Sequence, residues 1–291
     1  MVDMHIHTLY SDGDKTLEEV LISCEEKHLD YISITDHNNC EGYKDNIWKK
    51  KIYTGKIVCG VEMNAFLDNG KRIELLGYNI KNTNIINEWS QQFYSEKVLK
   101  DRFIKDKQKI IDICNKNHFI YDIDAIKKDI PYTDFYVVYM YYELIKYPEN
   151  IEKMGECAKS FNDFRKLGLS NPKSIFYMGE DNSSKPMFRD VANIIHQAGG
   201  LVFLAHPFEY KFEDTIGFIN KLRTKIKLDG IECFHPSAML DNRINLLVEY
   251  AKKNNLFISG GSDYHGDKKT NNDIGMLNIP NNYIEEWVET I

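Results

Sequence analysis

The sequence predicts an α/β fold that is built from parallel βαβ units and interrupted by a helical insertion. Short apolar stretches alternate with helical patterns over residues 1–84, and the same alternation resumes over residues 187–291. Between them, residues 85–186 are rich in lysine and mostly have helical periodicity. Alternating strands and helices are typical of a parallel sheet with helical crossovers. We therefore expect 1–84 and 187–291 to form one α/β domain, with 85–186 inserted into it as a small helical domain.

The first part of the chain begins with a predicted strand over Val2–His7. A helix is expected over Thr16–Lys27, because Thr16-Leu17-Glu18-Glu19 has the capping-box pattern that starts helices. Asp68-Asn69-Gly70 predicts a hairpin turn. Three further strands are expected, over Tyr31–Thr35, Lys56–Met63 and Arg72–Ile80.

The inserted segment contains little that resembles a buried strand. Ile104, Ile110, Ile111 and Cys114 are expected on one face of a long helix, and Tyr136–Leu144 on another helix. After the insertion, helices are predicted over Met187–Gln197, Thr215–Ile226 and Asn242–Asn254. The strands between and after them are expected over Leu201–Ala205, Gly230–Phe234 and Leu256–Gly260.

The composition excludes several classes of protein. With 291 residues and 43% hydrophobic residues, the chain can bury a core and is not disordered throughout. Its formal charge of −7 argues against holding long nucleic acid by bulk charge. The six cysteines form no C-x-x-C pair, which favours ordinary thiols in a reducing compartment. There is no signal-peptide pattern and no apolar run long enough to span a bilayer, so we expect a cytoplasmic protein.

Polar side chains gather where the predicted strands end. His5 and His7 have i, i+2 spacing at the end of the first strand and therefore point to the same side. Further histidines and carboxylates follow the other strands: Asp36, His37, Glu62, His206, His235, Asp263 and His265. In a βα barrel the carboxyl ends of the strands meet on one face, where active sites are built. The sequence therefore predicts that these side chains converge.

Imidazole nitrogens and carboxylate oxygens together suit zinc, iron or manganese, and carboxylates can bridge two such ions. Bridged metal ions can activate water and bind phosphate oxygens. A single histidine is more often a structural residue than a ligand. Polar residues that merely cap strands would not favour two separate i, i+2 pairs, so the metal-site interpretation is preferred.

These residues lie in short motifs that resemble those of the PHP (polymerase and histidinol phosphatase) family. The motifs are Asp3-Met4-His5-Ile6-His7-Thr8, Ser11-Asp12-Gly13, Thr35-Asp36-His37-Asn38, Gly60-Val61-Glu62, Leu204-Ala205-His206-Pro207 and Gly261-Ser262-Asp263-Tyr264-His265-Gly266. Six short motifs in this order form a specific pattern. The insertion is similar to the helical cap of the stand-alone phosphoesterases in that family.

The resemblance implies a distorted (βα)7 TIM-like barrel that holds two or three divalent metal ions, manganese, iron or zinc. It implies a first metal bound by His5, His7, Glu62 and Asp263, with Glu62 bridging. It implies a second metal bound by Asp12, His37 and His265, and a third held by His206. The family usually has a histidine where this chain has Glu74, and a carboxylate can replace it as a ligand. Asp3 and Asp36 are expected to orient ligand histidines or to accept backbone hydrogen bonds.

The function that the resemblance implies is metal-dependent hydrolysis of small phosphate esters, such as nucleotides or nucleotide bisphosphates. A hydroxide that bridges the metals would attack phosphorus, and Asp12 or His206 would protonate the leaving group. Arg102, Arg165 and His235 are candidate substrate-binding residues. The alternatives are a 5′–3′ exonuclease on short RNA or DNA oligonucleotides, a histidinol-phosphate-type phosphatase, and a non-catalytic metal-binding module. No membrane partner and no long nucleic acid are expected.

Overall fold

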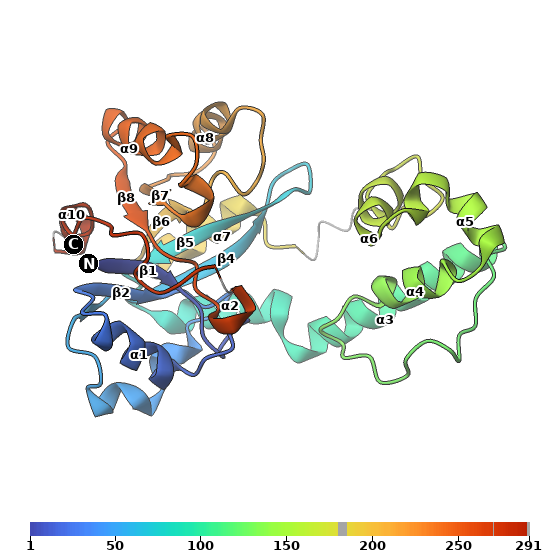
Figure 1. Cartoon of the computed structure of the whole chain (residues 1–291), viewed down its shortest axis with the longest axis horizontal. Helices are drawn as coiled ribbons and strands as arrows, with labels where there is room; N and C mark the ends of the chain where they lie inside the picture. Colours follow the sequence, from blue (N-terminus) through green and yellow to red (C-terminus); the bar gives the residue numbers. More distant parts are fainter. Residues whose placement is uncertain (180–184, 270, 290–291) are drawn as a thin grey trace. The chain divides into compact units, whose positions relative to one another are not determined.

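The structure, a computed structural model, describes residues 1–179, 185–269 and 271–289 (Figure 1). The chain divides into two compact units. We call the unit made of Met1–Gln91 and Lys185–Ile291 the sheet unit, and the unit made of Gln92–Ser184 the helical unit.

The sheet unit contains two sheets. The first has the strand order β1-β2-β3, and the second has the order β4-β5-β6-β7-β8. The strands are β1 (Val2–Ile6), β2 (Tyr31–Ile34), β3 (Lys56–Ile57), β4 (Gly60–Phe66), β5 (Arg72–Tyr78), β6 (Leu201–Leu204), β7 (Gly230–Phe234) and β8 (Phe257–Gly260). The segment predicted as one strand over Lys56–Met63 is divided, because β3 pairs with β2 whereas β4 pairs with β5.

One strand departs from an all-parallel arrangement. β5 runs antiparallel to both of its neighbours, β4 and β6, whereas β6, β7 and β8 are parallel. The cause is local: Leu67 donates a backbone hydrogen bond to Lys71 across the predicted turn, and Gly70 has a positive φ of 76° that glycine adopts without strain. The hairpin prediction is thus confirmed.

The two sheets meet at two places. Ile6, at the end of β1, forms an isolated parallel bridge with Tyr264, just after β8. His37, just after β2, forms another with Glu62 of β4. Among the described residues the strands form two sheets, and these single bridges join them. The joints bring the carboxyl ends of β1, β2 and β8 together with the start of β4, so Glu62 lies near the beginning of a strand and not at its end.

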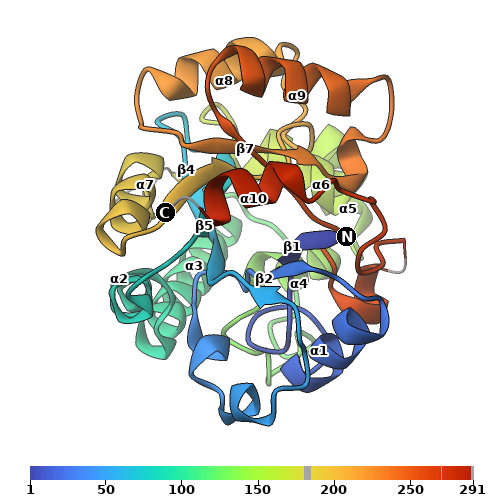
Figure 2. The same ribbon diagram turned by 90° about the vertical axis from the view of Figure 1, so that its left-hand side faces the viewer.

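Helices surround these strands, as Figure 2 shows for α1, α7, α8 and α9. The helices of the sheet unit are α1 (Leu17–Glu26), α7 (Phe188–Gln197), α8 (Thr215–Arg223), α9 (Arg243–Lys253) and α10 (Asn282–Val288), and α2 (Thr83–Tyr94) begins in it. The capping box predicted at the start of α1 is present, since the Thr16 hydroxyl accepts from Glu19 N–H while the Glu19 carboxylate accepts from Thr16 N–H. The buried face of α1 packs on Ile32 and Ile34 of β2.

An apolar cluster between the strands and α10 supports the inside of the sheet unit. The Trp287 ring of α10 is fully buried, with its centroid 5.1 Å from those of both Tyr78 and Phe203. Its Nε1 donates to the carbonyl of Ile258 at 3.0 Å, and the Tyr78 hydroxyl donates to Met4 O at 2.9 Å. Burying an aromatic residue of this size contributes several kcal/mol, about 3–5 when it is truncated to alanine.

The helical unit has its own core. It contains α3 (Glu96–Lys116), α4 (Tyr136–Leu144), α5 (Pro148–Met154) and α6 (Phe161–Asp163). Ile110 and Cys114 of α3 are fully buried with Met140 and Phe164. Ile104, predicted on the same face, is 64% exposed, because a separation of six residues at 100° each turns it away from Ile110.

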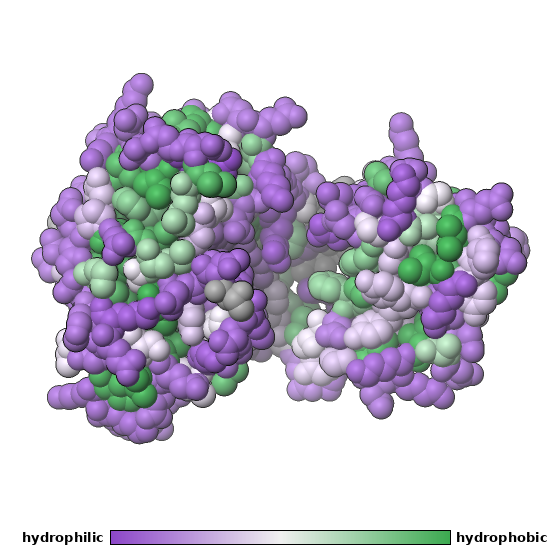
Figure 3. Space-filling model, viewed as in Figure 1, coloured by the Kyte–Doolittle hydropathy of each residue, from purple (hydrophilic) through white to green (hydrophobic). Residues whose placement is uncertain are grey.

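The surface of each unit is mainly hydrophilic on the face seen in Figure 3, with apolar side chains scattered over it. In the described parts of the chain, no helix combines the length and the apolar character that crossing a membrane requires.

Candidate metal centre

The structure brings the predicted metal ligands together in the sheet unit. His5 and Glu62 come from β1 and β4, and Glu74 comes from β5. The remaining members follow strands or lie in loops: His7, Asp12, His37, His206, Asp263 and His265. All but two of these side chains are buried; Asp12 is 56% exposed and His37 23%. The sequence pattern therefore located one cluster from segments far apart in the chain.

A first group is formed by His5, His7, Glu62 and Asp263. Glu62 Oε2 lies 3.1 Å from His5 Nε2 and 3.2 Å from His7 Nε2. Asp263 Oδ1 lies 3.5 Å from His5 Nε2 and 3.3 Å from His7 Nε2. The two imidazole Nε2 atoms face each other at 3.1 Å. Four ligand-type atoms thus crowd around one point, as the ligands of a cation do.

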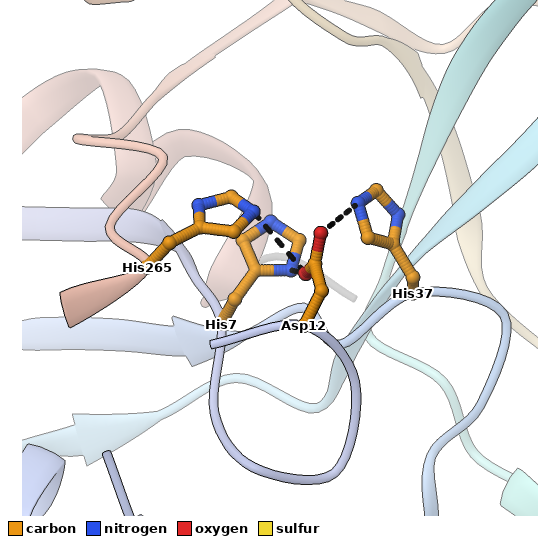
Figure 4. Close-up of side chains that lie close together, drawn as sticks. All are labelled: His7, Asp12, His37 and His265. Carbon is orange, nitrogen blue, oxygen red and sulfur yellow. Dashed lines mark ion pairs between the residues drawn. The ribbon is translucent and has the colours of Figure 1, made fainter. Parts of the chain in front are cut away.

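A second group surrounds Asp12 (Figure 4). The carboxylate lies between the ring of His37 on one side and those of His7 and His265 on the other. Asp12 Oδ1 is 3.2 Å from His265 Nε2 and 3.7 Å from His7 Nδ1, and Oδ2 is 3.7 Å from His37 Nε2. His265 Nδ1 contacts the carbonyl of Asp263 at 2.8 Å, which places the proton on Nδ1 and leaves the Nε2 lone pair for a metal.

A third group contains two carboxylates and one imidazole, Glu62, Glu74 and His206. His206 Nε2 lies 2.8 Å from Glu62 Oε1 and 3.5 Å from Glu74 Oε2. Glu62 therefore directs Oε2 to the first group and Oε1 to the third. This is the geometry that a bridging carboxylate needs.

Buried carboxylates and imidazoles lie in contact in this cluster, and each shifts the pKa of its neighbours. Burial disfavours the ionised form of Glu62, yet the neighbouring His5 and His37 hold its pKa well below the usual range. Burial also disfavours charge on His7 and His206, but the hydrogen bonds that their rings donate to carboxylates outweigh it and raise the pKa of each to about 9. Burial dominates at His37 and lowers its pKa to about 4. The positive charges of protonated His7 and His206 thus balance the negative charges of the neighbouring carboxylates.

Glu232 is a part of the centre that sequence reasoning missed. It lies in the apolar strand β7 and is fully buried. Its Oε1 accepts from His5 Nδ1 at 2.8 Å, and its Oε2 accepts from the backbone N–H of His206 at 2.7 Å. Because the proton of His5 is held on Nδ1, Nε2 is available to a metal. The available signal was the acidic residue itself, since a buried carboxylate in an apolar strand needs a partner.

Asp3 accepts backbone hydrogen bonds, one of the two roles expected for it and Asp36, whereas Asp36 accepts one backbone N–H and two hydroxyls. Asp3 accepts from the N–H groups of His5, Ser262 and Gly275. Asp36 accepts from Thr8 N–H at 2.8 Å and from the Ser11 hydroxyl at 2.6 Å. Asp36 thereby fixes the loop that carries Asp12.

The predicted substrate-binding residues lie in different units. His235 is buried beside the cluster, with Nε2 3.5 Å from Asp263 Oδ2. Arg102 belongs to α3 of the helical unit, where it donates to Phe93 O at 3.2 Å. Arg165 follows α6 and donates to Asn162 Oδ1 at 3.3 Å. For both arginines, substrate binding stays a prediction.

The residues present fit divalent metal ions. His37 Nδ1 is buried without a hydrogen-bond partner among the described atoms and lies 3.3 Å from Glu62 Oε2. Imidazole nitrogens and carboxylate oxygens are the ligands that zinc, iron and manganese accept. The oriented His5 supports the same conclusion, since metal-binding histidines usually donate their second N–H to a carboxylate or a carbonyl.

A family model for the PHP domain matches residues 3–166, more than half of the chain, and the protein belongs to this family. The phosphoribosyl 1,2-cyclic phosphate 1,2-diphosphodiesterase of Eggerthella lenta is 23% identical over 265 residues, which cover 91% of this chain and 94% of that protein. The 5′–3′ exoribonuclease of Haemophilus influenzae is 25% identical over 269 residues, covering 90% and 89%.

A solved structure shares the fold. It is that of a candidate metal-dependent phosphoesterase from Bifidobacterium adolescentis, with a TM-score of 0.62, 20% identity, and coverage of 98% of this chain and 94% of that one. The family and these two relatives place the protein among the phosphoesterases, which are hydrolases that act on phosphoric ester bonds. Membership in the PHP family of metal-dependent phosphoesterases implies divalent metal ions, and the clusters described above supply candidate sites for them.

Proposed function

We propose that the protein is a metal-dependent phosphoesterase that hydrolyses phosphate esters of small molecules, with nucleotides or nucleotide bisphosphates as the expected substrates. The observation that carries this proposal is the position of Glu62. One of its oxygens faces the imidazoles of the first group, and the other faces His206. A carboxylate placed in this way can hold two cations close enough to act on one phosphoryl group.

Two or three ions of manganese, iron or zinc are proposed. The ligands of the first would be His5, His7, Glu62 and Asp263, those of the second Asp12, His37 and His265, and those of the third Glu62, Glu74 and His206. When bound, divalent ions here would polarise phosphoryl oxygens and lower the pKa of the attacking water. Glu232 would keep His5 oriented, and Asp36 would keep the Asp12 loop in place.

Of the two proton donors expected from the resemblance, His206 fits better than Asp12. Burial disfavours protonated His206, but its hydrogen bond with Glu62 raises its pKa to about 9. Asp12 is the reverse case, because the hydrogen bond from His265 and the charge of His37 overcome partial burial and hold its pKa below the usual range. His206 can donate a proton only while its Nε2 is not a metal ligand, so its two proposed roles exclude each other.

We also propose that the helical unit serves as a cap that contributes Arg102 and Arg165 to substrate binding. Its separate core supports the view that it is a folding unit added to the catalytic domain. A second candidate function is 5′–3′ exonuclease activity on short oligonucleotides. The similarity to the Haemophilus influenzae exoribonuclease over 90% of this chain supports this second candidate function.

The test compares phosphate release by chelator-treated protein before and after addition of Mn²⁺, Fe²⁺ or Zn²⁺. The substrates are a nucleoside monophosphate, a nucleoside 3′,5′-bisphosphate, histidinol phosphate and a labelled oligoribonucleotide. Metal-dependent release from the mononucleotides is expected, and Asp263→Asn should reduce kcat/KM by at least about 100-fold, roughly 2.7 kcal/mol.

Glu143→Gln serves as the control, because Glu143 is a buried carboxylate of the helical unit that contacts Lys146 and Asp122 N–H. Full activity of Asp263→Asn would refute the proposed site. Hydrolysis of the oligoribonucleotide alone would reverse the order of the two functions.

A further inference from the structure

The two oxygens of Asp263 face different surroundings. Oδ1 lies 3.3 Å from His7 Nε2 and 3.5 Å from His5 Nε2, in the first metal group. Oδ2 instead contacts Lys269 Nζ at 2.5 Å and lies 3.5 Å from His235 Nε2. The carboxylate therefore has one side for a metal ion and one side occupied by nitrogen donors. Lys269 was not singled out by the sequence, where it is part of a Lys268-Lys269 pair.

The hydrogen bonds of His235 determine which of its nitrogens carries the proton. Its Nδ1 accepts the backbone N–H of Ser237 at 3.1 Å, at the start of the short 3-10 helix over Pro236–Ala238. A nitrogen that accepts from a backbone amide has no proton, so the neutral ring carries its proton on Nε2. His235 is 1% exposed, and this Nε2 has no hydrogen-bond partner among the described atoms. A buried N–H donor next to the metal cluster thus has only a long contact, 3.5 Å to Asp263 Oδ2.

Lys269 places a positive charge next to the carboxylate of Asp263. It ends the 3-10 helix Gly266–Lys269, directly after the Asp263 and His265 motif. Its side chain is 43% exposed, whereas that of Asp263 is 4% exposed. An ammonium group has three N–H donors, and the contact with Asp263 uses one of them. The others are available on the solvent side of the carboxylate.

Glu209, His235 and Asp263 also meet the distance criterion for a cation site. The tautomer of His235 argues against that use, because Nε2 carries a proton where a metal would need a lone pair. The Lys269 ammonium on the same Asp263 oxygen adds electrostatic repulsion against a further cation. The same two features suit an anion, since both present N–H donors.

We propose that Lys269 Nζ and His235 Nε2–H together bind a phosphate oxygen of the substrate, beside the metal ions and outside their ligand set. This inference rests on the proposed function and names a contact that would fix the phosphoryl group relative to Asp263. The ligand is a phosphate monoester or diester. One of its non-bridging oxygens accepts a hydrogen bond from Lys269 and another from His235.

The experiment measures inorganic phosphate binding to the Mn²⁺-loaded protein by calorimetry, together with kcat, KM and metal content by mass spectrometry. The variants are Lys269→Met, which removes the charge at similar length, and Lys269→Arg, which keeps it. Lys27→Met is the matched control, because Lys27 is 37% exposed and donates to an exposed aspartate, Asp273, at 2.7 Å. Lys269→Met is expected to keep its metal and to weaken phosphate binding on the order of 10- to 100-fold, the range for a charge-assisted hydrogen bond.

Lys269→Arg should restore part of this affinity, and Lys27→Met should match wild type. Unchanged phosphate affinity in metal-loaded Lys269→Met overturns the inference. Loss of metal from Lys269→Met also overturns it, because Lys269 would then only position Asp263. Lys269→Met could instead bind one more Mn²⁺ than wild type, and the double variant Lys269→Met/Glu209→Gln could lose that ion again. This result would overturn the inference and assign Glu209, His235 and Asp263 to a cation site. Wild-type protein without phosphoesterase activity would refute the proposed function, whereas active wild type with an unaffected Lys269→Met refutes only this contact.

Discussion

Replacing Glu232 by glutamine should weaken metal binding although Glu232 is not itself a proposed ligand. Its two oxygens accept two hydrogen bonds, from His5 Nδ1 at 2.8 Å and from His206 N–H at 2.7 Å. Glutamine has one oxygen and one NH2 group. In one of the two contacts its NH2 group would therefore face another N–H donor, and no hydrogen bond could form there. Either the His5 ring or the backbone at His206 must then shift, and both belong to the metal cluster.

The expected magnitude follows from this loss of orientation. Changing a partner that orients a metal-binding histidine typically costs 10- to 100-fold in metal affinity. This corresponds to about 1.4–2.7 kcal/mol. Glu232 also favours the protonated form of His5, whose pKa is raised well above the usual value against the effect of burial. Because protons compete with metal less at high pH, the loss should be larger at pH 9 than at pH 7.

The assay is a Mn²⁺ titration of chelator-treated protein against a fluorescent indicator, for wild type, Glu232→Gln and Glu143→Gln. Glu143 is also a buried carboxylate that accepts a backbone N–H, but it belongs to the core of the helical unit. Its variant should lose stability and keep the Mn²⁺ affinity of wild type. If Glu232→Gln binds Mn²⁺ within about twofold of wild type at both pH values, the orienting role of Glu232 is wrong.

Three further outcomes are expected. Glu74→His should shift metal preference at the third group from Mn²⁺ toward Zn²⁺, because it replaces a carboxylate by an imidazole; metal content after dialysis against equal Mn²⁺ and Zn²⁺ measures this, and an unchanged ratio would show that Glu74 is not a ligand. Raised pKa values of His7 and His206, about 9 against the ordinary 6.5, stabilise the metal-free fold fully below pH 6.5, and this stability is lost as pH rises through 9. Denaturant unfolding of the chelator-treated protein should therefore show a falling free energy over pH 6.5–9, while Mn²⁺ affinity rises; a flat profile would contradict the assignment. Trp287→Ala should cost about 3–5 kcal/mol of unfolding free energy, measured in urea, and a cost below 1 kcal/mol would mean that the cluster around α10 adapts to the cavity.

The sequence was sufficient to locate the cluster of candidate metal ligands, because residues two apart in a strand point to the same side. His5 and His7 are two residues apart at a strand end, and Asp263 and His265 repeat this spacing after β8. The hairpin at Asp68-Asn69-Gly70 was predictable for a similar reason, since only local turn chemistry is involved. The family resemblance then assigned each ligand to a metal.

The remaining features depend on contacts that spacing does not encode. Glu232 is 227 positions from His5 in the chain, and a single acidic residue in an apolar strand does not identify its partner. Lys269 looks like a solvated lysine until its contact with Asp263 is seen. The break between β3 and β4 is likewise tertiary, because the same extended segment pairs first with β2 and then with β5.

The bridge between Ile6 and Tyr264 has a consequence for the order of events during biosynthesis. His5 and His7 are synthesised long before their partners Asp263 and His265, and the bridge beside β1 can form only after both segments have left the ribosome. Closing so long a loop is a slow step of folding. Native loading of the proposed metals is therefore expected only after these two distant segments have paired, so that occupancy of the centre reports that the sheet unit has closed.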